Sequence, residues 1–227
     1  MKKISGHIVY VLFLFLLSCG NRSGEKEQQN NSANQPNRKD QTATKNILFF
    51  GNSLTAGYGL DEPSQSFPGL VQKKIDSLNL PYRVINGGVS GETTAGGLGR
   101  IDFVLKQQAV DVFVLELGAN DGLRGVSLDQ TRKNLQGIID KVKTKYPEAK
   151  LVMAGMQIPP NMGADYANNF RNIFPELAKK NNMSLIPFLL EGVGGEVKYN
   201  QRDGIHPTAE GHEILAENVW SELKKVL

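Results

Sequence analysis

Short apolar runs alternate along this chain with longer segments in which apolar residues recur at helical spacing. Continuous runs of this length suit strands that are buried on both faces of a sheet. Five such runs cover residues 47–50, 84–85, 112–117, 151–154 and 184–188. Apolar residues at intervals of three and four predict helices beside these runs. The helical segments cover residues 67–78, 98–107, 128–146, 166–180 and 208–227.

The alternation of strand and helix predicts an α/β fold, a three-layer α/β/α sandwich around a parallel five-stranded sheet. Crossovers between the parallel strands should be right-handed. In open sheets of this kind, ligands bind beyond the carboxyl ends of the strands. We therefore expect functional residues to follow the apolar runs directly.

The first 18 residues have the features of a signal peptide. Lys2 and Lys3 provide a positive start, and residues 8–17 form an apolar run that is too short to span a bilayer comfortably. Cys19 follows just after this run. The arrangement resembles the lipobox of bacterial lipoproteins, which implies that Cys19 is lipidated and becomes the mature N-terminus. The alternative is an unmodified cysteine in an uncleaved anchor.

Residues 19–45 are rich in Asn, Gln, Ser, Lys and Glu and contain almost nothing apolar. Such a segment cannot bury enough surface to fold, so we predict a disordered tether. Residues 46–227 have a length that suits one domain. The predicted organisation is therefore a signal peptide over 1–18, a tether over 19–45 and one folded domain over 46–227.

The charge balance gives no sign of a nucleic-acid partner. The full chain of 227 residues has a formal net charge of +3, and loss of Lys2 and Lys3 with the signal peptide lowers it to +1. The basic residues are dispersed, which argues against nucleic acid. Cys19 is the only cysteine, so a disulfide within one chain and a thiol-rich metal site are excluded.

Ser53 follows the first predicted strand and is preceded by Gly51 and Asn52. A serine at a strand-to-helix turn can act as a nucleophile, although a capping serine in a plain turn is the alternative. The second strand is followed by a glycine-rich loop over 86–93. Glycine lets the backbone approach a ligand closely, so the N–H of Gly91 could donate to an oxyanion. The alternative is a loop that only caps the next helix.

Asn120 follows the third strand, and its neutral amide suits oxyanion stabilisation. An Asx turn is the alternative. Asp203 and His206 precede the last helix with Gly204 between them. Histidine can take and return a serine proton while a carboxylate orients its ring. The alternative is a capping Asp and a surface His. His212 lies within the predicted final helix, which disfavours it as the base.

Together these segments resemble the blocks of the SGNH (GDSL) hydrolase superfamily, across almost all of residues 46–227. Similarity is greatest to its bacterial thioesterase, lysophospholipase and arylesterase branch, and it lies in the stretches 53–58, 116–125 and 203–207. The resemblance implies a flavodoxin-like fold and no metal or cofactor. It implies Ser53 as nucleophile, with Asp203 and His206 completing the triad. The oxyanion hole would consist of Ser53, Gly91 and Asn120.

One position departs from the family pattern. Asn52 stands where the family has Asp before the serine, so a negative charge is lost beside the nucleophile. Asp203 fills the triad position, so this difference concerns the local geometry of the turn. Ser53 also lacks the surrounding Gly-x-Ser-x-Gly pattern, which argues against the ordinary α/β-hydrolase fold.

The expected activity is hydrolysis of carboxylic esters through an acyl-enzyme at Ser53. Expected substrates are aryl esters and lysophospholipids, with acyl thioesters as a further class. Apolar residues after the fourth strand are candidates to line an acyl groove: Met156, Ile158, Pro159, Pro160 and Met162, with Leu189 and Leu190 nearby. Ordinary core packing is the alternative for them.

Two other functions stay open, a carbohydrate O-acetylesterase and, more remotely, a non-catalytic binding module. The predicted lipid on Cys19 implies a membrane partner and export to the periplasm or cell surface. Gly20 rather than Asp follows the cysteine, so we expect attachment to the outer membrane.

Overall fold

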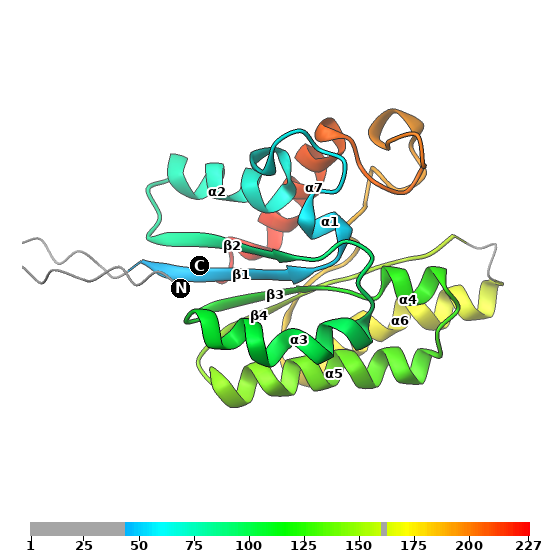
Figure 1. Ribbon diagram of the computed structural model, residues 1–227, viewed down its shortest axis with the longest axis horizontal. Helices are drawn as coiled ribbons and strands as arrows, with labels where there is room; N and C mark the ends of the chain where they lie inside the picture. The colour runs from blue at the N-terminus through cyan, green and yellow to red at the C-terminus, as the bar shows by residue number, and fades with distance from the viewer. Residues whose placement is uncertain (1–43, 160–162) are drawn as a thin grey trace, which may run out of the picture. The chain divides into compact units, whose positions relative to one another are not determined.

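The computed structural model describes residues 44–159 and 163–227. It contains a five-stranded parallel sheet in the order β2-β1-β3-β4-β5, which confirms the predicted sheet (Figure 1). The strands are β1 (Lys45–Gly51), β2 (Tyr82–Gly88), β3 (Val112–Glu116), β4 (Lys150–Ala154) and β5 (Ser184–Ile186). The predicted signal peptide, Cys19 and nearly all of the predicted tether lie outside the described residues.

Helices cover both faces of the sheet, so the predicted three-layer α/β/α arrangement is confirmed. Two helices lie on one face, α2 (Phe67–Ser77) and α7 (Ala209–Leu223) (Figure 1). Three cover the other face, α3 (Thr94–Gln107), α5 (Leu128–Lys145) and α6 (Ala164–Asn181). Within the described ranges, no helix is long and apolar enough to cross a membrane.

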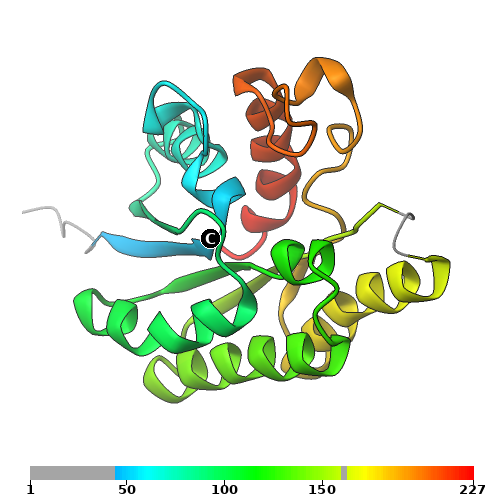
Figure 2. The ribbon, with the colours of Figure 1, turned by 45° about the vertical axis from the view of Figure 1, so that its right-hand side comes forward.

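Four short elements were not expected from the apolar pattern. They are α1 (Ser53–Ala56), α4 (Ala119–Leu123) and the 3₁₀ helices η1 (Pro63–Gln65) and η3 (Val197–Tyr199). Helices this short present too few residues for an apolar period to show. Figure 2 shows α1, α4 and the segment between β5 and α7 gathered beyond the carboxyl ends of the strands.

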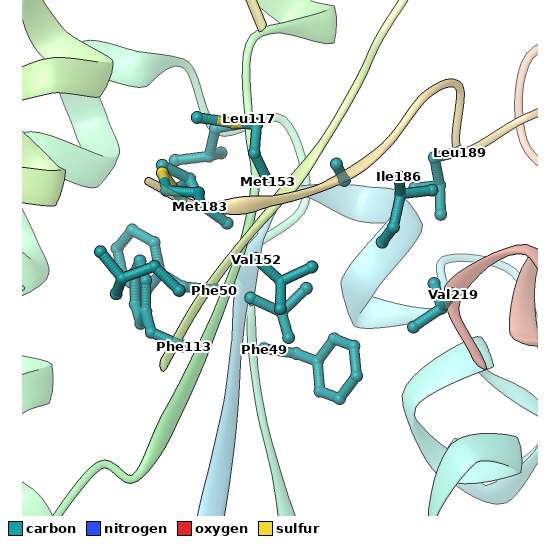
Figure 3. Packing of buried hydrophobic residues seen from close by; sticks show 14 of the residues in the cluster. Phe49, Phe50, Phe113, Leu117, Val152, Met153, Met183, Ile186, Leu189 and Val219 are labelled. Atoms are coloured by element: carbon teal, nitrogen blue, oxygen red, sulfur yellow. The ribbon is translucent and has the colours of Figure 1, made fainter. Parts of the chain in front are cut away.

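Adjacent residues of β1 pack into the two halves of the core, one on each face of the sheet. Phe49 and Phe50 are both fully buried and point to opposite faces of the sheet (Figure 3). Phe49 meets the ring of Phe67 from α2 edge-on, with ring centroids 5.6 Å apart. Phe50 lies beside Phe113, with ring centroids 5.8 Å apart. Burial of one such side chain stabilises the fold by roughly 1.5–3 kcal/mol.

Several predicted boundaries shift for local reasons. Helix α3 begins at Thr94, four residues before the predicted start, because the Thr93 side chain caps it by accepting the Gly96 N–H. Strand β5 ends at Ile186 because Pro187 cannot donate to a ladder. The last helix ends at Leu223 rather than at the chain end.

Candidate active site

Ser53 is the first residue of α1, directly beyond the end of β1. Gly51 makes the tight turn possible, because a Cβ there would lie 2.1 Å from the Thr55 hydroxyl oxygen. The Asn52 side chain caps the helix, and its Oδ1 accepts the Leu54 N–H at 2.9 Å. The turn therefore presents the Ser53 hydroxyl at the carboxyl edge of the sheet.

The three predicted triad residues meet at this edge. Nε2 of His206 lies 2.9 Å from Oγ of Ser53, and Nδ1 of His206 lies 2.6 Å from Oδ2 of Asp203. The first distance allows the imidazole to accept the serine proton, and the second fixes the tautomer that leaves Nε2 free to do so. Ser53, His206 and Asp203 thus form one hydrogen-bonded chain.

A short loop holds the Asp203 carboxylate rigidly. Its Oδ1 accepts two backbone N–H groups, those of Ile205 and His206, each at 3.0 Å. Hydrogen bonding to the His206 ring, followed by these two backbone bonds, lowers the pKa of Asp203 to about 2. Gly204 turns the loop with φ of +75°, a conformation that favours glycine. The carboxylate is therefore ionised at neutral pH and well below it.

The predicted oxyanion donors surround the same space as the nucleophile. Ser53, Gly91 and Asn120 all line one cavity of about 510 Å³. Gly91 has φ of +77°, and among the described residues its N–H donates to no backbone carbonyl. One N–H of the Asn120 amide donates to the Glu92 carbonyl at 2.9 Å, which ties α4 to the Gly91 loop. The second amide N–H has no partner among the described residues and can donate to a ligand.

A partly buried ion pair between Arg100 and Glu92 supports the Gly91 loop. Both guanidinium nitrogens Nε and Nη2 of Arg100 lie 2.6 Å from the Glu92 carboxylate. Nη2 of Arg100 also donates to the Gly87 carbonyl at 2.7 Å, and the guanidinium stacks 4.0 Å from the Phe50 ring centre. A planar guanidinium can satisfy all these partners at once, whereas Lys cannot.

A second buried carboxylate fixes α4. Asp121 is 1% exposed and accepts both the backbone N–H of Thr94 at 2.8 Å and its hydroxyl at 2.5 Å. The residue after the candidate oxyanion amide is thereby tied to the start of α3. The Gly91 loop and α4, which carry two of the candidate oxyanion donors, are therefore joined to each other.

The cavity is lined largely by apolar side chains. Met156, Ile158 and Pro159 line it, although Met156 is only 1% exposed, and their part in substrate binding stays a prediction. Pro160 and Met162 lie outside the described residues. Leu190 also lines the cavity. The expectation for Leu189 is wrong, because its side chain is fully buried in the core beside Ile186 and Val219 (Figure 3). Leu189 thus points into the core, whereas its neighbour Leu190 points to the cavity.

Glu116 is the main feature of the site that was not predicted from the sequence. It is the last residue of β3, is 1% exposed, and accepts hydrogen bonds from both Asn52 and Thr55. Burial raises its pKa to about 7, against the opposing effect of these hydrogen bonds. In the sequence, a charged residue at the end of an otherwise apolar strand could have indicated a buried carboxylate at the site.

His212 plays a structural part in α7, in keeping with its expected place inside a helix. It is 1% exposed, and its Nδ1 accepts the Phe67 N–H at 3.1 Å. Burial, assisted by the nearby His206, lowers its pKa to about 4. No group of three or more His, Cys, Asp or Glu side chains within residues 44–159 and 163–227 could hold a metal ion.

Comparison with known proteins supports the same interpretation of the chain. Residues 49–214 match the model of the GDSL-like lipase/acylhydrolase family. The chain is 40% identical to the esterase TesA of Pseudomonas aeruginosa over 187 residues, which covers 82% of this chain and 92% of the relative. It is 38% identical to an arylesterase of Vibrio mimicus over 185 residues, 82% of this chain and 91% of the relative.

A third relative is the thioesterase 1/protease 1/lysophospholipase L1 of Escherichia coli. It is 35% identical over 185 residues, 82% of this chain and 86% of the relative. Among solved structures, a crystal structure of TesA superimposes with a TM-score of 0.77 at 39% identity. That match covers 81% of this chain and 100% of the TesA chain.

Proposed function

This chain belongs to the GDSL-like lipase/acylhydrolase family and is a carboxylic ester hydrolase, and we propose that Ser53 is its nucleophile. The observation that carries this assignment is the unbroken hydrogen-bonded chain from Ser53 through His206 to Asp203. In this scheme His206 is the general base and acid. Asp203 orients the imidazole and stabilises it once it is protonated.

The first half of the reaction acylates the enzyme. As Oγ of Ser53 attacks the ester carbonyl, its proton passes to Nε2 of His206. The carbonyl oxygen becomes an oxyanion, which the N–H groups of Ser53 and Gly91 and the Asn120 amide would hold. The C–O bond to the leaving group then breaks, and the protonated His206 gives its proton to the departing alkoxide. An acyl group is left on Ser53.

The second half returns the enzyme to its starting state. A water molecule gives a proton to Nε2 of His206 as its oxygen attacks the acyl carbon. The same donors stabilise the second oxyanion. The bond to Oγ breaks, and the proton moves from His206 back to Ser53 while the carboxylic acid leaves.

The cavity supports esters with an apolar acyl or aryl part as substrates. Met156, Ile158 and Leu190 offer it an apolar wall. Its mouth carries exposed apolar side chains, since Tyr58 is 52% and Ile205 48% exposed. These features, together with the relatives named as arylesterase and lysophospholipase, favour aryl esters and lysophospholipids, with acyl thioesters as a further class.

Hydrolysis of p-nitrophenyl butyrate by Ser53→Ala tests the assignment of the nucleophile. Ser90→Ala is the matched control, because Ser90 is a second serine that lines the same cavity. We expect Ser53→Ala to lose turnover and covalent labelling by a fluorophosphonate, and Ser90→Ala to keep both. Labelling that survives in Ser53→Ala but disappears in Ser90→Ala would reverse the roles. A folded wild-type protein that neither labels nor turns over would favour a binding module.

A series of p-nitrophenyl esters from acetyl to palmitoyl tests the acyl preference. If the apolar wall binds the acyl chain, kcat/KM should rise beyond the acetyl ester and then fall once the chain exceeds the cavity. A profile confined to acetyl esters would contradict this and favour a carbohydrate O-acetylesterase.

The proposed location is the surface of a membrane, reached through a lipid on Cys19, and it rests on the sequence alone. Fractionation of cells that express wild-type protein or Cys19→Ala tests it. The wild type should sediment with outer membranes, whereas Cys19→Ala should not. Equal distribution of the two proteins would contradict lipid attachment at this cysteine.

A further inference from the structure

Asn52 and Glu116 form a buried pair directly behind the nucleophile. Each is 1% exposed, and Nδ2 of Asn52 donates to Oε1 of Glu116 at 2.8 Å. The other end of the Asn52 amide, Oδ1, accepts the Leu54 N–H at 2.9 Å and lies 3.5 Å from Oγ of Ser53. One side chain thus connects a buried carboxylate to the turn that presents Ser53.

Asn52 and Thr55 donate all of their hydrogen bonds with Glu116 to its carboxylate oxygens. Oε2 accepts the backbone N–H groups of Asn52 at 3.1 Å and Thr55 at 3.3 Å, and the Thr55 hydroxyl at 2.7 Å. With the amide of Asn52, four donors point at two oxygens. Such an arrangement suits an ionised carboxylate, since only the Thr55 hydroxyl among the donors could accept a proton in return.

Charged groups approach this pair from two sides. From α3, Nη2 of Arg100 reaches the Gly51 carbonyl at 3.4 Å while the same guanidinium is paired with Glu92. From the loop before α7, His206 and its partner Asp203 lie beyond Ser53. The groups of the Asn52 turn and α1 that contact Glu116 are backbone N–H groups, an amide and a hydroxyl, all uncharged. No described cation contacts the Glu116 carboxylate directly, so neutral donors hold it.

We propose that Asn52 is a positioning residue that lets the nucleophile turn keep its geometry in alkaline solution without a bound proton. An aspartate at this position would put a second carboxylate 2.8 Å from Glu116, where no N–H would lie between them. Two buried carboxylates this close must share a proton, because both cannot be ionised together. The amide of Asn52 supplies the same hydrogen bond from a group that never titrates.

The raised pKa of Glu116 fits this arrangement. Burial moves the pKa to about 7, so the wild-type carboxylate is ionised above pH 7. Well above that pH the folded wild type holds no proton in this pair. In Asn52→Asp the folded state keeps one shared proton that the unfolded chain lacks. Its unfolding constant should therefore rise relative to the wild type as pH rises through 7, and by about tenfold per pH unit well above it.

The test compares wild type, Asn52→Asp and the exchanged pair Asn52→Asp/Glu116→Gln from about pH 7 to 10, the range above the raised pKa. In the exchanged pair, Nε2 of the introduced glutamine can donate to the introduced aspartate. Its Oε1 can accept the three donors that Oε2 of Glu116 accepts in the wild type. Chemical unfolding is measured at each pH, together with kcat/KM for p-nitrophenyl butyrate. Other groups that titrate in this range are common to all three proteins and cancel.

We expect Asn52→Asp to lose stability relative to the wild type as pH rises, and its kcat/KM to gain an alkaline limb. The exchanged pair should recover the wild-type pH dependence of both. Parallel pH profiles for all three proteins would overturn the proposal, as would an exchanged pair as sensitive to alkali as Asn52→Asp. If Asn52→Asp does not fold, the exchanged pair alone tests the proposal. The proposal then stands if the exchanged pair folds with the wild-type pH dependence of unfolding, and it fails if the exchanged pair does not. The kcat/KM part rests on the proposed ester hydrolysis, whereas the unfolding part needs no catalysis and can fail separately.

Discussion

The ring of Tyr58 lies against the imidazole of His206, with ring centroids 4.6 Å apart and an angle of 44° between the planes. Tyr58 is half-exposed and stands at the mouth of the cavity. The loops that carry the two rings are also joined directly, since Nε2 of Gln201 donates to the Tyr58 carbonyl at 2.7 Å. Tyr58 therefore limits how far the candidate base can turn away from Ser53.

Removing this ring should weaken catalysis without abolishing it. Aromatic contacts of this kind contribute about 0.5–1.5 kcal/mol, so Tyr58→Ala should lower kcat/KM for p-nitrophenyl acetate by about 2- to 12-fold. Tyr58→Phe keeps the ring and should stay close to wild type. Equal losses in both variants would assign the effect to the phenolic hydroxyl instead. Steady-state kinetics on the three proteins makes the comparison.

Asp203→Asn should cost far more than the loss of Tyr58. The amide can hold the imidazole but favours the wrong tautomer, and an equivalent change in a serine hydrolase triad lowers kcat by about 10⁴-fold. Because the pKa of Asp203 is lowered to about 2, its protonation does not reduce wild-type activity near neutral pH. A kcat within about tenfold of wild type would show that Asp203 does not orient the base. Thermal unfolding of both proteins checks that the fold is retained.

Asn120→Ala should lower kcat more than it raises KM, because an oxyanion donor acts mainly in the transition state. Loss of one such donor costs about 10²–10³-fold in kcat. Asn218→Ala is a suitable control, since the Asn218 amide also donates to backbone carbonyls but does not line the cavity. If both variants lose activity alike, the role of Asn120 is structural. Steady-state kcat and KM distinguish these results.

His212 should make the fold less stable as the pH falls. Its pKa is about 4 in the folded state against an ordinary value of 6.5, so the unfolded chain binds the proton first. Its contribution is complete above about pH 6.5 and is lost progressively down to about pH 4, by up to about 3 kcal/mol.

His212→Asn isolates this contribution, because Oδ1 of asparagine can accept the Phe67 N–H without titrating. The free energy of unfolding of wild type minus that of the variant should decline from about pH 7 to about pH 4. The difference is the useful quantity, since Glu116 has a raised pKa and acts in the opposite direction over much of this range. A difference that does not change with pH would contradict the prediction.

Apolar spacing was enough to predict the layers, the parallel sheet and the place of the site. The strands are nearly continuous apolar runs, and a parallel sheet brings their carboxyl ends to one edge. The order of residues along the chain therefore indicates that Ser53, Gly91 and Asn120 surround one space. The cavity that these three residues share agrees with that expectation.

Contacts between distant buried polar groups could not be predicted in the same way. The bonds from Asn52 to Glu116 span 64 positions, and those from Thr94 to Asp121 span 27. Nothing in the spacing of apolar residues specifies which polar side chains will meet. The direction of Leu189 into the core rather than into the cavity has the same origin, because no regular period extends beyond the end of β5.

Three hydrogen bonds join α4 to the Gly91 loop and the start of α3, so two of the candidate oxyanion donors, Gly91 and Asn120, belong to one connected segment. Asn120 holds the Glu92 carbonyl, and Asp121 holds the start of α3 at Thr94. A local opening that releases one of these contacts loosens the other, so both donors would leave their places in one event. Such an opening would leave the Ser53 N–H as the one candidate donor still in place, on a turn that is tied to the sheet through Glu116.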